Sequence, residues 1–159
     1  MLRLMIVEVM VGMVVLCGCG KKTVTVPTPD GKMTIDKESG QTTMTIQGDN
    51  GQQTTVTAGQ KVTIPKDFPS DIPIYSGATP TAVASMPDGQ NVSLEIKDPA
   101  AKVFQYYQNE LPKKGWKVQA TVNTAGGSMV TATKEKQQVI VNVITDNGKT
   151  IVNLTVSRG

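Results

Sequence analysis

The stretch that decides the fold is residues 98–116, which read DPAAKVFQYYQNELPKKGW. Asp98 is expected as the N-cap of a helix, with Pro99 at the first helical position. Pro112 and Gly115 are expected to end the helix. Between them, apolar side chains recur every three or four residues and form one stripe: Ala100, Val103, Phe104, Tyr107 and Leu111. The stretch therefore predicts a single amphipathic helix that needs an apolar surface to lie on.

Short alternating segments flank this helix on both sides and predict strands of an antiparallel sheet. We expect two strands to form a hairpin before the helix and four strands to follow it. Their expected bounds are 81–86, 91–97, 116–122, 129–133, 138–145 and 150–157. Asn147-Gly148, between the last two, is typical of a tight hairpin turn. We therefore expect an α+β domain over residues 81–159, a single helix packed on an antiparallel sheet in the order ββαββββ.

A proline-rich joint, residues 65–80, precedes this domain. A proline about every four residues excludes both a helix and a central strand. The apolar side chains of Phe68, Ile74 and Tyr75 would be wasted on a free linker, so we expect an extended strap that lies against the domain. All six aromatic residues of the chain fall between Phe68 and Trp116, which places the expected core here.

Residues 19–64 repeat a short pattern of apolar residue, threonine, apolar residue, from Val24-Thr25-Val26 to Val62-Thr63-Ile64. A period of two places the apolar pair on one face of a strand and threonine on the other. Turn-forming stretches separate the copies. One interpretation is a meander of four or five short strands, whose thin apolar face must rest on the next domain, a partner or another copy. The other is a flexible stalk rich in Thr, Gln and Gly.

The first eighteen residues resemble the signal peptide of a bacterial lipoprotein. An apolar run leads into Leu16-Cys17-Gly18-Cys19, which resembles a lipobox with the small residue Gly18 directly before the acceptor cysteine. The resemblance implies cleavage between Gly18 and Cys19, with a diacylglycerol thioether and an N-acyl chain such as palmitate on Cys19. The alternative is an uncleaved transmembrane helix, but this run has only about 15 apolar residues and a bilayer needs about 20.

The lipoprotein resemblance also implies a place in the cell envelope. Several acyl chains together give effectively permanent attachment to a membrane. If the host is Gram-negative, Gly20 after the modified cysteine implies the periplasmic face of the outer membrane. The partners expected are the membrane, through this anchor, and an unidentified envelope protein.

The composition argues against several kinds of chemistry. The chain contains no histidine, which removes the commonest general base and the commonest metal ligand. Of its two cysteines, Cys17 would leave with the signal peptide and Cys19 would carry lipid, so no thiol remains for a disulfide or a metal. The net charge of +3 is spread along the chain without a basic block, which disfavours nucleic acid as a partner. We expect no enzyme activity, no metal and no cofactor beyond the acyl groups.

Residues 65–116 resemble a domain of uncharacterised bacterial lipoproteins. The resemblance rests on two stretches, Phe68–Ala78 (FPSDIPIYSGA) and Phe104–Trp116 (FQYYQNELPKKGW). It implies a fold and a location, but no activity.

Three aromatic residues are the candidates for contact with a ligand or partner: Phe104, Tyr107 and Trp116. Aromatic side chains at helical spacing beside a sheet more often belong to a core. We expect a non-catalytic interaction or structural accessory module. The alternative is a carrier of small molecules or lipid in a pocket between helix and sheet. A carrier needs an apolar cavity of roughly 300 Å³ or more beside Phe104 and Tyr107, whereas an interaction module exposes an apolar patch or an unpaired sheet edge.

Overall fold

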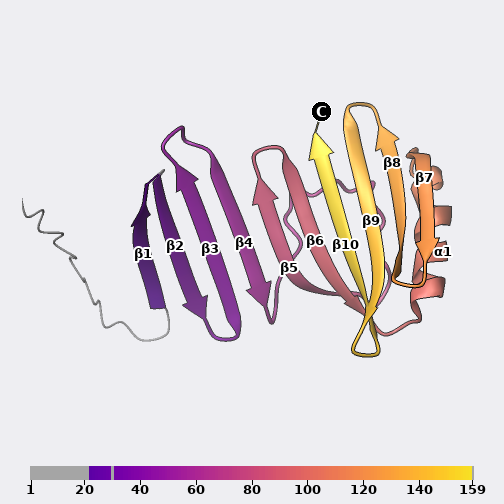
Figure 1. Ribbon diagram of the computed structural model, residues 1–159, viewed down its shortest axis with the longest axis horizontal. Coiled ribbons are helices and arrows are strands. Elements are labelled where there is room, and N and C mark those ends of the chain that lie inside the picture. Colours follow the sequence, from indigo (N-terminus) through magenta and orange to yellow (C-terminus); the bar gives the residue numbers. More distant parts are fainter. Residues whose placement is uncertain (1–21, 30, 159) are drawn as a thin grey trace, which may run out of the picture.

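The computed structural model describes residues 22–29 and 31–158. In this part of the chain, ten antiparallel strands form one sheet that carries one helix (Figure 1). The strands lie side by side in the order β1-β2-β3-β4-β5-β6-β10-β9-β8-β7. The expected signal peptide, with its cleavage site at Gly18 and Cys19 and the lipid attachment at Cys19, lies outside the described residues.

The first four strands form a meander rather than a stalk. Their bounds are β1 (Lys22–Thr28), β2 (Gly31–Glu38), β3 (Gln41–Gly48) and β4 (Gln53–Gly59). Val24 pairs with Ile35, and Ile35 pairs with Met44, so the apolar positions of neighbouring strands share one face of the sheet. The last copy of the repeat forms no strand, because Val62 instead packs into the core of the following domain.

The meander and the α+β domain belong to the same sheet. β4 pairs with β5 (Thr79–Met86), from Thr55 opposite Ser85 to Ala58 opposite Ala82. The remaining elements are β6 (Gly89–Ile96), α1 (Ala100–Lys113), β7 (Lys117–Thr124), β8 (Gly127–Lys134), β9 (Gln137–Asp146) and β10 (Lys149–Arg158). β10 lies between β6 and β9. The predicted order ββαββββ, preceded by a β-meander, is confirmed.

The helix buries the predicted stripe but begins differently from the prediction. Its buried residues are Val103, Phe104, Tyr107 and Leu111. The N-cap position is Pro99, not Asp98, and no side chain caps the first turn. The Asp98 carboxylate instead accepts hydrogen bonds from the Tyr75 hydroxyl, at 2.6 Å, and the Lys102 ammonium, at 3.1 Å. These two donors hold the carboxylate in place of the backbone amides that an N-cap would bind.

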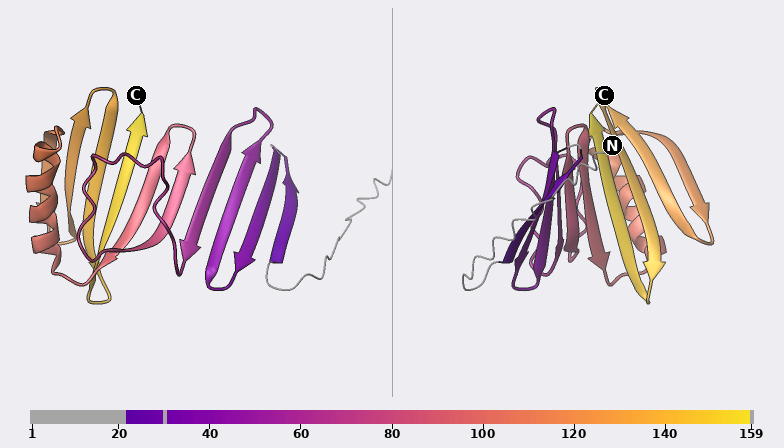
Figure 2. Two further views of the ribbon diagram at one scale, coloured as in Figure 1. Left: turned by 180° about the vertical axis from the view of Figure 1, so that it is seen from behind. Right: turned by 60° about the vertical axis from the view of Figure 1, so that its left-hand side comes forward.

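The core lies between the sheet and a second layer made of α1 and the proline-rich strap. Of the strap residues expected to lie against the domain, Phe68 and Tyr75 are buried and Ile74 is partly buried against the core. Ile72, which was not among them, is buried as well. The Trp116 indole N–H donates to the Asp71 carbonyl oxygen at 3.2 Å, which ties the end of the helix to the strap. Viewed from behind, the strap crosses the sheet on the same side as the helix (Figure 2).

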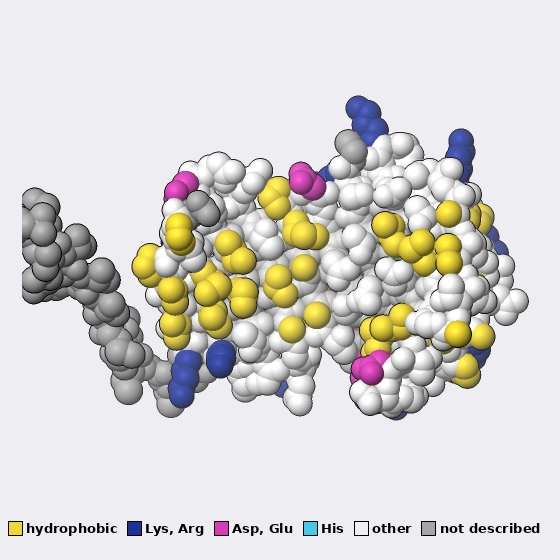
Figure 3. Space-filling model, in the orientation of Figure 1, with side chains coloured by type: hydrophobic (Ala, Val, Ile, Leu, Met, Phe, Trp, Pro, Cys, Tyr) yellow, Lys and Arg dark blue, Asp and Glu magenta, His cyan; other side chains and the backbone are white. Residues whose placement is uncertain are grey.

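The other side of the sheet, here called the open face, is not covered by any described element. Figure 3 views the molecule from this side and shows apolar side chains gathered over β1–β4. Val24, Val26 and Ile46 are 56%, 41% and 44% exposed. No residue of β1–β4 is buried. The meander is therefore a single layer, whereas the α+β domain has two.

The strand β7 forms one edge of the sheet, and all eight of its residues are exposed. The alternation over 116–122 predicts that Val118, Ala120 and Val122 share one side of the sheet. A register shift between Val118 and Ala120 interrupts this alternation. As a result, Val118 pairs with the buried Ala132 on the core side, while Val122 pairs with Met129 on the open face. A bulge of this kind changes which side of the sheet the following residues occupy.

Residues 22–29 and 31–158 contain neither a membrane-spanning helix nor a cluster of metal ligands. No helix there is both long enough and apolar enough to cross a bilayer. No group of three or more Asp, Glu, Cys or His side chains is placed to share a metal ion.

Candidate functional site

A cleft opens between the first half of α1 and the β7–β8 hairpin, and we call it the helix–hairpin cleft. Its volume is about 450 Å³. Phe104, Gln105 and Gln108 line it from the helix, Asn123 and Ser128 line it from the hairpin, and β9 supplies its inner end. It therefore lies between helix and sheet, in the region where the carrier alternative places a pocket.

The lining of the helix–hairpin cleft is neutral. None of the described residues that border it is ionisable. Gln105, Gln108 and Asn123 offer amide groups, and the Ser128 hydroxyl already donates to Asn123 Oδ1 at 2.7 Å. Such a lining suits an uncharged molecule that combines hydrogen-bonding groups with an apolar part packed against Phe104. It holds no general acid or base and no activated nucleophile.

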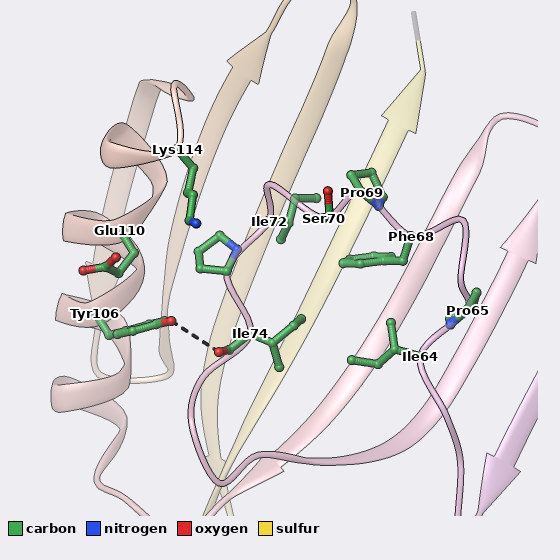
Figure 4. A pocket seen from close by; sticks show the side chains of 11 residues that line it. Ile64, Pro65, Phe68, Pro69, Ser70, Ile72, Ile74, Tyr106, Glu110 and Lys114 are labelled. Atoms are coloured by element: carbon green, nitrogen blue, oxygen red, sulfur yellow. Dashed lines mark hydrogen bonds between the residues drawn. The ribbon is translucent and has the colours of Figure 1, made fainter.

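A second hollow, the strap groove, lies between the strap and the second half of α1. Its volume is about 490 Å³. Figure 4 shows the strap side chains of Phe68 and Ile74 turned toward each other, with the Ile74 carbonyl oxygen turned toward Tyr106 of the helix. The Tyr106 hydroxyl donates to the Ile74 carbonyl oxygen at 3.3 Å and bridges the two walls. Glu110 is paired with Lys113 at 2.7 Å, so its charge is already balanced.

The structure separates the three aromatic candidates. Phe104 is 6% exposed and borders the helix–hairpin cleft. Tyr107 and Trp116 are 0% and 2% exposed and lie in the core. Contact of Phe104, Tyr107 or Trp116 with a ligand stays a prediction, and Phe104 is the one of them that a molecule in the cleft could reach.

The polar residues of the cleft are not among the candidates named from the sequence. Gln105 and Gln108 are three residues apart and therefore share one side of the helix, a signal that the sequence does contain. Asn123 and Ser128 face each other across the hairpin, which follows from the pairing of β7 with β8. No sequence pattern shows that this hairpin approaches the helix.

The groups with shifted pKa values serve structure rather than chemistry. The hydrogen bond from Tyr75, helped by Lys102, lowers the pKa of Asp98, and the same bond raises the pKa of Tyr75. Burial raises the pKa of Tyr107 well above its usual value. Asp98 and Tyr75 join the start of the helix to the strap, so this pair fixes the second layer in position.

The segment that carries the cleft has a family counterpart. Residues 77–149 match the family model described as START domain-like. This START-like segment is just under half of the chain and contains α1 and every residue that lines the helix–hairpin cleft. It leaves out β1–β4, most of the strap and all of β10 except Lys149. No curated protein and no solved structure matches the chain.

Proposed function

We propose that this protein is a lipid-anchored, non-catalytic lipoprotein of the cell envelope whose α+β domain binds an envelope protein. The anchor rests on the Leu16–Cys19 lipobox, and in a Gram-negative host it would hold the protein at the periplasmic face of the outer membrane. The neutral lining of the helix–hairpin cleft supports a role without catalysis. The observation that carries the binding role is the free edge of β7.

The free edge is protected over only part of its length. Lys117 and the bulge between Val118 and Ala120 guard its first half, since charges and bulges discourage the addition of another strand. The second half, Ala120–Thr124, is regular, uncharged and exposed, with Val122 at 43% exposure. Backbone N–H and C=O groups on such an edge can pair with an extended segment of a partner. We propose that the partner adds a strand here.

Crosslinking and pull-down from intact cells tests this binding role. A Val122→Lys variant should recover the partner in clearly lower yield than the full-length wild type, because a lysine on an edge strand opposes strand addition. Thr25→Lys is the control, since Thr25 is exposed on β1 at the opposite edge of the same sheet and lies on the side away from the apolar stripe. Equal recovery from all three proteins would overturn the proposed edge contact.

Mass spectrometry of the protein purified from cells tests the anchor separately. The mature chain should begin at Cys19 and carry the mass of a diacylglycerol and an acyl chain, and a Cys19→Ala variant should lack this mass. A wild-type chain that still begins at Met1 and carries no lipid would refute the lipoprotein assignment.

A carrier of a small neutral molecule is the second candidate, favoured by the volume of the helix–hairpin cleft, about 450 Å³. This volume is above the roughly 300 Å³ that small-molecule sites need. The cleft is more polar than the apolar cavity expected beside Phe104 and Tyr107, and Tyr107 does not border it. Native mass spectrometry of the purified protein should then show a bound neutral compound. Ala101→Phe, which fills the cleft, should lose it, while Asn109→Phe on the exposed side of α1 should retain it. A wild type without any bound compound would count against the carrier.

A further inference from the structure

We infer that the open face of the meander lies on the membrane surface and contacts anionic lipid headgroups. This inference rests on the proposed function, because it requires the lipid anchor at Cys19. It assigns a role to β1–β4, which lie outside the START-like segment and have no second layer.

The open face of the meander is apolar along its length. Register pairs place the apolar side chains of all four strands on this one side: Val24, Val26, Met33, Ile35, Met44, Ile46, Val56 and Ala58. The same registers place the threonines that alternate with them, such as Thr25 and Thr34, on the opposite side. An apolar patch that nothing in the fold covers is typical of a contact surface for a protein or a membrane.

The strand carboxylates of the meander lie on one side only, whereas lysines lie on both sides. Lys22 pairs with Lys37, on the same side as the apolar stripe. At the strand positions of this side, which the structure describes in full, there is no carboxylate. Asp36 lies on the other side, where it accepts a hydrogen bond from Thr23. Two lysines directly opposite each other repel, and lipid phosphates would relieve that repulsion.

The position of the anchor brings this face to the membrane. Only Gly20 and Lys21 separate Cys19 from Lys22, where β1 begins. Three residues span at most about 11 Å, so an acylated Cys19 holds the first strand close to the headgroups. Figure 3 shows basic side chains at the end of the apolar patch where β1 starts. Because the anchor keeps the meander at a high effective concentration near the membrane, even a weak attraction to the headgroups is enough for docking.

A second copy of the chain fits this face less well. Four strands about 4.8 Å apart and about 25 Å long give this face an area of roughly 500 Å². Two such faces packed together would bury about 1,000 Å², which is less than the roughly 1,200–2,000 Å² of stable protein interfaces. A lipid surface has no such minimum, because the anchor already supplies the attachment.

The test uses the full-length, acylated protein in vesicles and nitroxide labels on introduced cysteines. The mature chain offers no other free thiol, so Val24→Cys and Thr25→Cys each give one label, on opposite sides of β1. Ile46→Cys and Thr45→Cys repeat the comparison on β3. In vesicles of phosphatidylglycerol and phosphatidylcholine, labels at 24 and 46 should lose their collisions with a water-soluble nickel chelate. Labels at 25 and 45 should keep them.

Charge variants test the lysines. Lys22→Glu combined with Lys37→Glu should restore nickel collisions at position 24, as should vesicles of phosphatidylcholine alone. Lys32→Glu is the matched control because Lys32 lies on the threonine side, and it should change nothing. Equal exposure of positions 24 and 25 on anionic vesicles would overturn the inference. Spin–spin coupling between labels at position 24 would also overturn it, in favour of pairing between two copies.

The failure of the anchor and the failure of docking give different results. Protein that carries no acyl mass and does not float with vesicles would refute the proposed function. Protein that is acylated and floats, but whose label at position 24 stays in water, would refute only the docking.

Discussion

The hydroxyl of Tyr107 is buried in the core and has no hydrogen-bond partner among the described residues. The ring itself is well placed, with the Tyr106 ring in an edge contact at 5.2 Å between centroids. The nearby backbone of Tyr75 opposes the rise in the pKa of Tyr107, but it makes no hydrogen bond of normal geometry with the hydroxyl. Tyr107 therefore contributes apolar packing and carries the cost of one desolvated polar group.

Removal of this hydroxyl should stabilise the protein. We expect Tyr107→Phe to raise the free energy of unfolding by about 1 kcal/mol, since a buried unsatisfied hydroxyl costs about 1–3 kcal/mol. Urea denaturation followed by Trp116 fluorescence measures the change. Tyr75→Phe is the matched control and should lower stability, because its hydroxyl donates to Asp98 at 2.6 Å. A loss of stability in Tyr107→Phe would show that the hydroxyl does have a partner.

The end of α1 is set by its backbone geometry. Gly115 has φ +86° and follows the helix in the left-handed region. The Trp116 N–H donates to the Leu111 carbonyl oxygen, and the Gly115 N–H donates to that of Pro112. These two bonds form a Schellman motif. The motif turns the chain so that Trp116 enters the core directly before β7 begins.

Gly115→Ala should therefore destabilise the fold without a steric clash. A Cβ at this position would lie 3.5 Å from the Lys134 side chain, an ordinary contact. The left-handed conformation alone should lower the free energy of unfolding by about 1 kcal/mol. Gly126→Ala, in the β7–β8 turn without a positive φ, should change stability little. Thermal unfolding of the two variants separates these expectations, and equal midpoints would contradict them.

At the scale of the whole molecule, one continuous sheet combines a two-layer half and a single-layer half. All buried apolar residues among those described lie between Val62 and Val156. β1–β4 are joined to this core through the pairing of β4 with β5, which extends only from Thr55 to Ala58. Stability within a fold follows local burial, so we expect it to fall steeply across this junction.

Hydrogen exchange followed by mass spectrometry should show this gradient in the full chain. Amides of β1–β4 should exchange much faster than those of β9 and β10, which lie in the middle of the two-layer half. Thr57→Pro removes a backbone donor from the junction and should speed exchange in β1–β4 further. The protection of β9 and β10 serves as the internal control and should persist. Uniform protection across the sheet would contradict this division.

The strands and the helix could be predicted because their signals are local. The stripe from Ala100 to Leu111 has the helical period, and the Asn147-Gly148 turn indicates a hairpin. The structure confirms the meander that the alternation of apolar residues and threonines indicates. The prediction that Asp98 caps the helix is wrong, because its carboxylate binds Tyr75 and Lys102 instead. Tyr75 is 23 residues away in sequence, so no local pattern indicates this contact. The sequence offers a pocket between helix and sheet only as an alternative, and it could not show that the β7–β8 hairpin would form one wall. That depends on the distance between two elements that are not neighbours in sequence.

The sequence by itself determined the elements, their order and the two sides of each strand, since periodicity acts over a few residues. The tertiary structure decided which side of the meander stays uncovered. β4 pairs with β5 in the register that places Thr57 opposite Val83, and Val83 faces the core. The threonines of the meander therefore lie on the side of the helix, and its apolar stripe lies on the open face. A shift of that pairing by one residue would exchange the two faces, and no local pattern in the chain fixes this register.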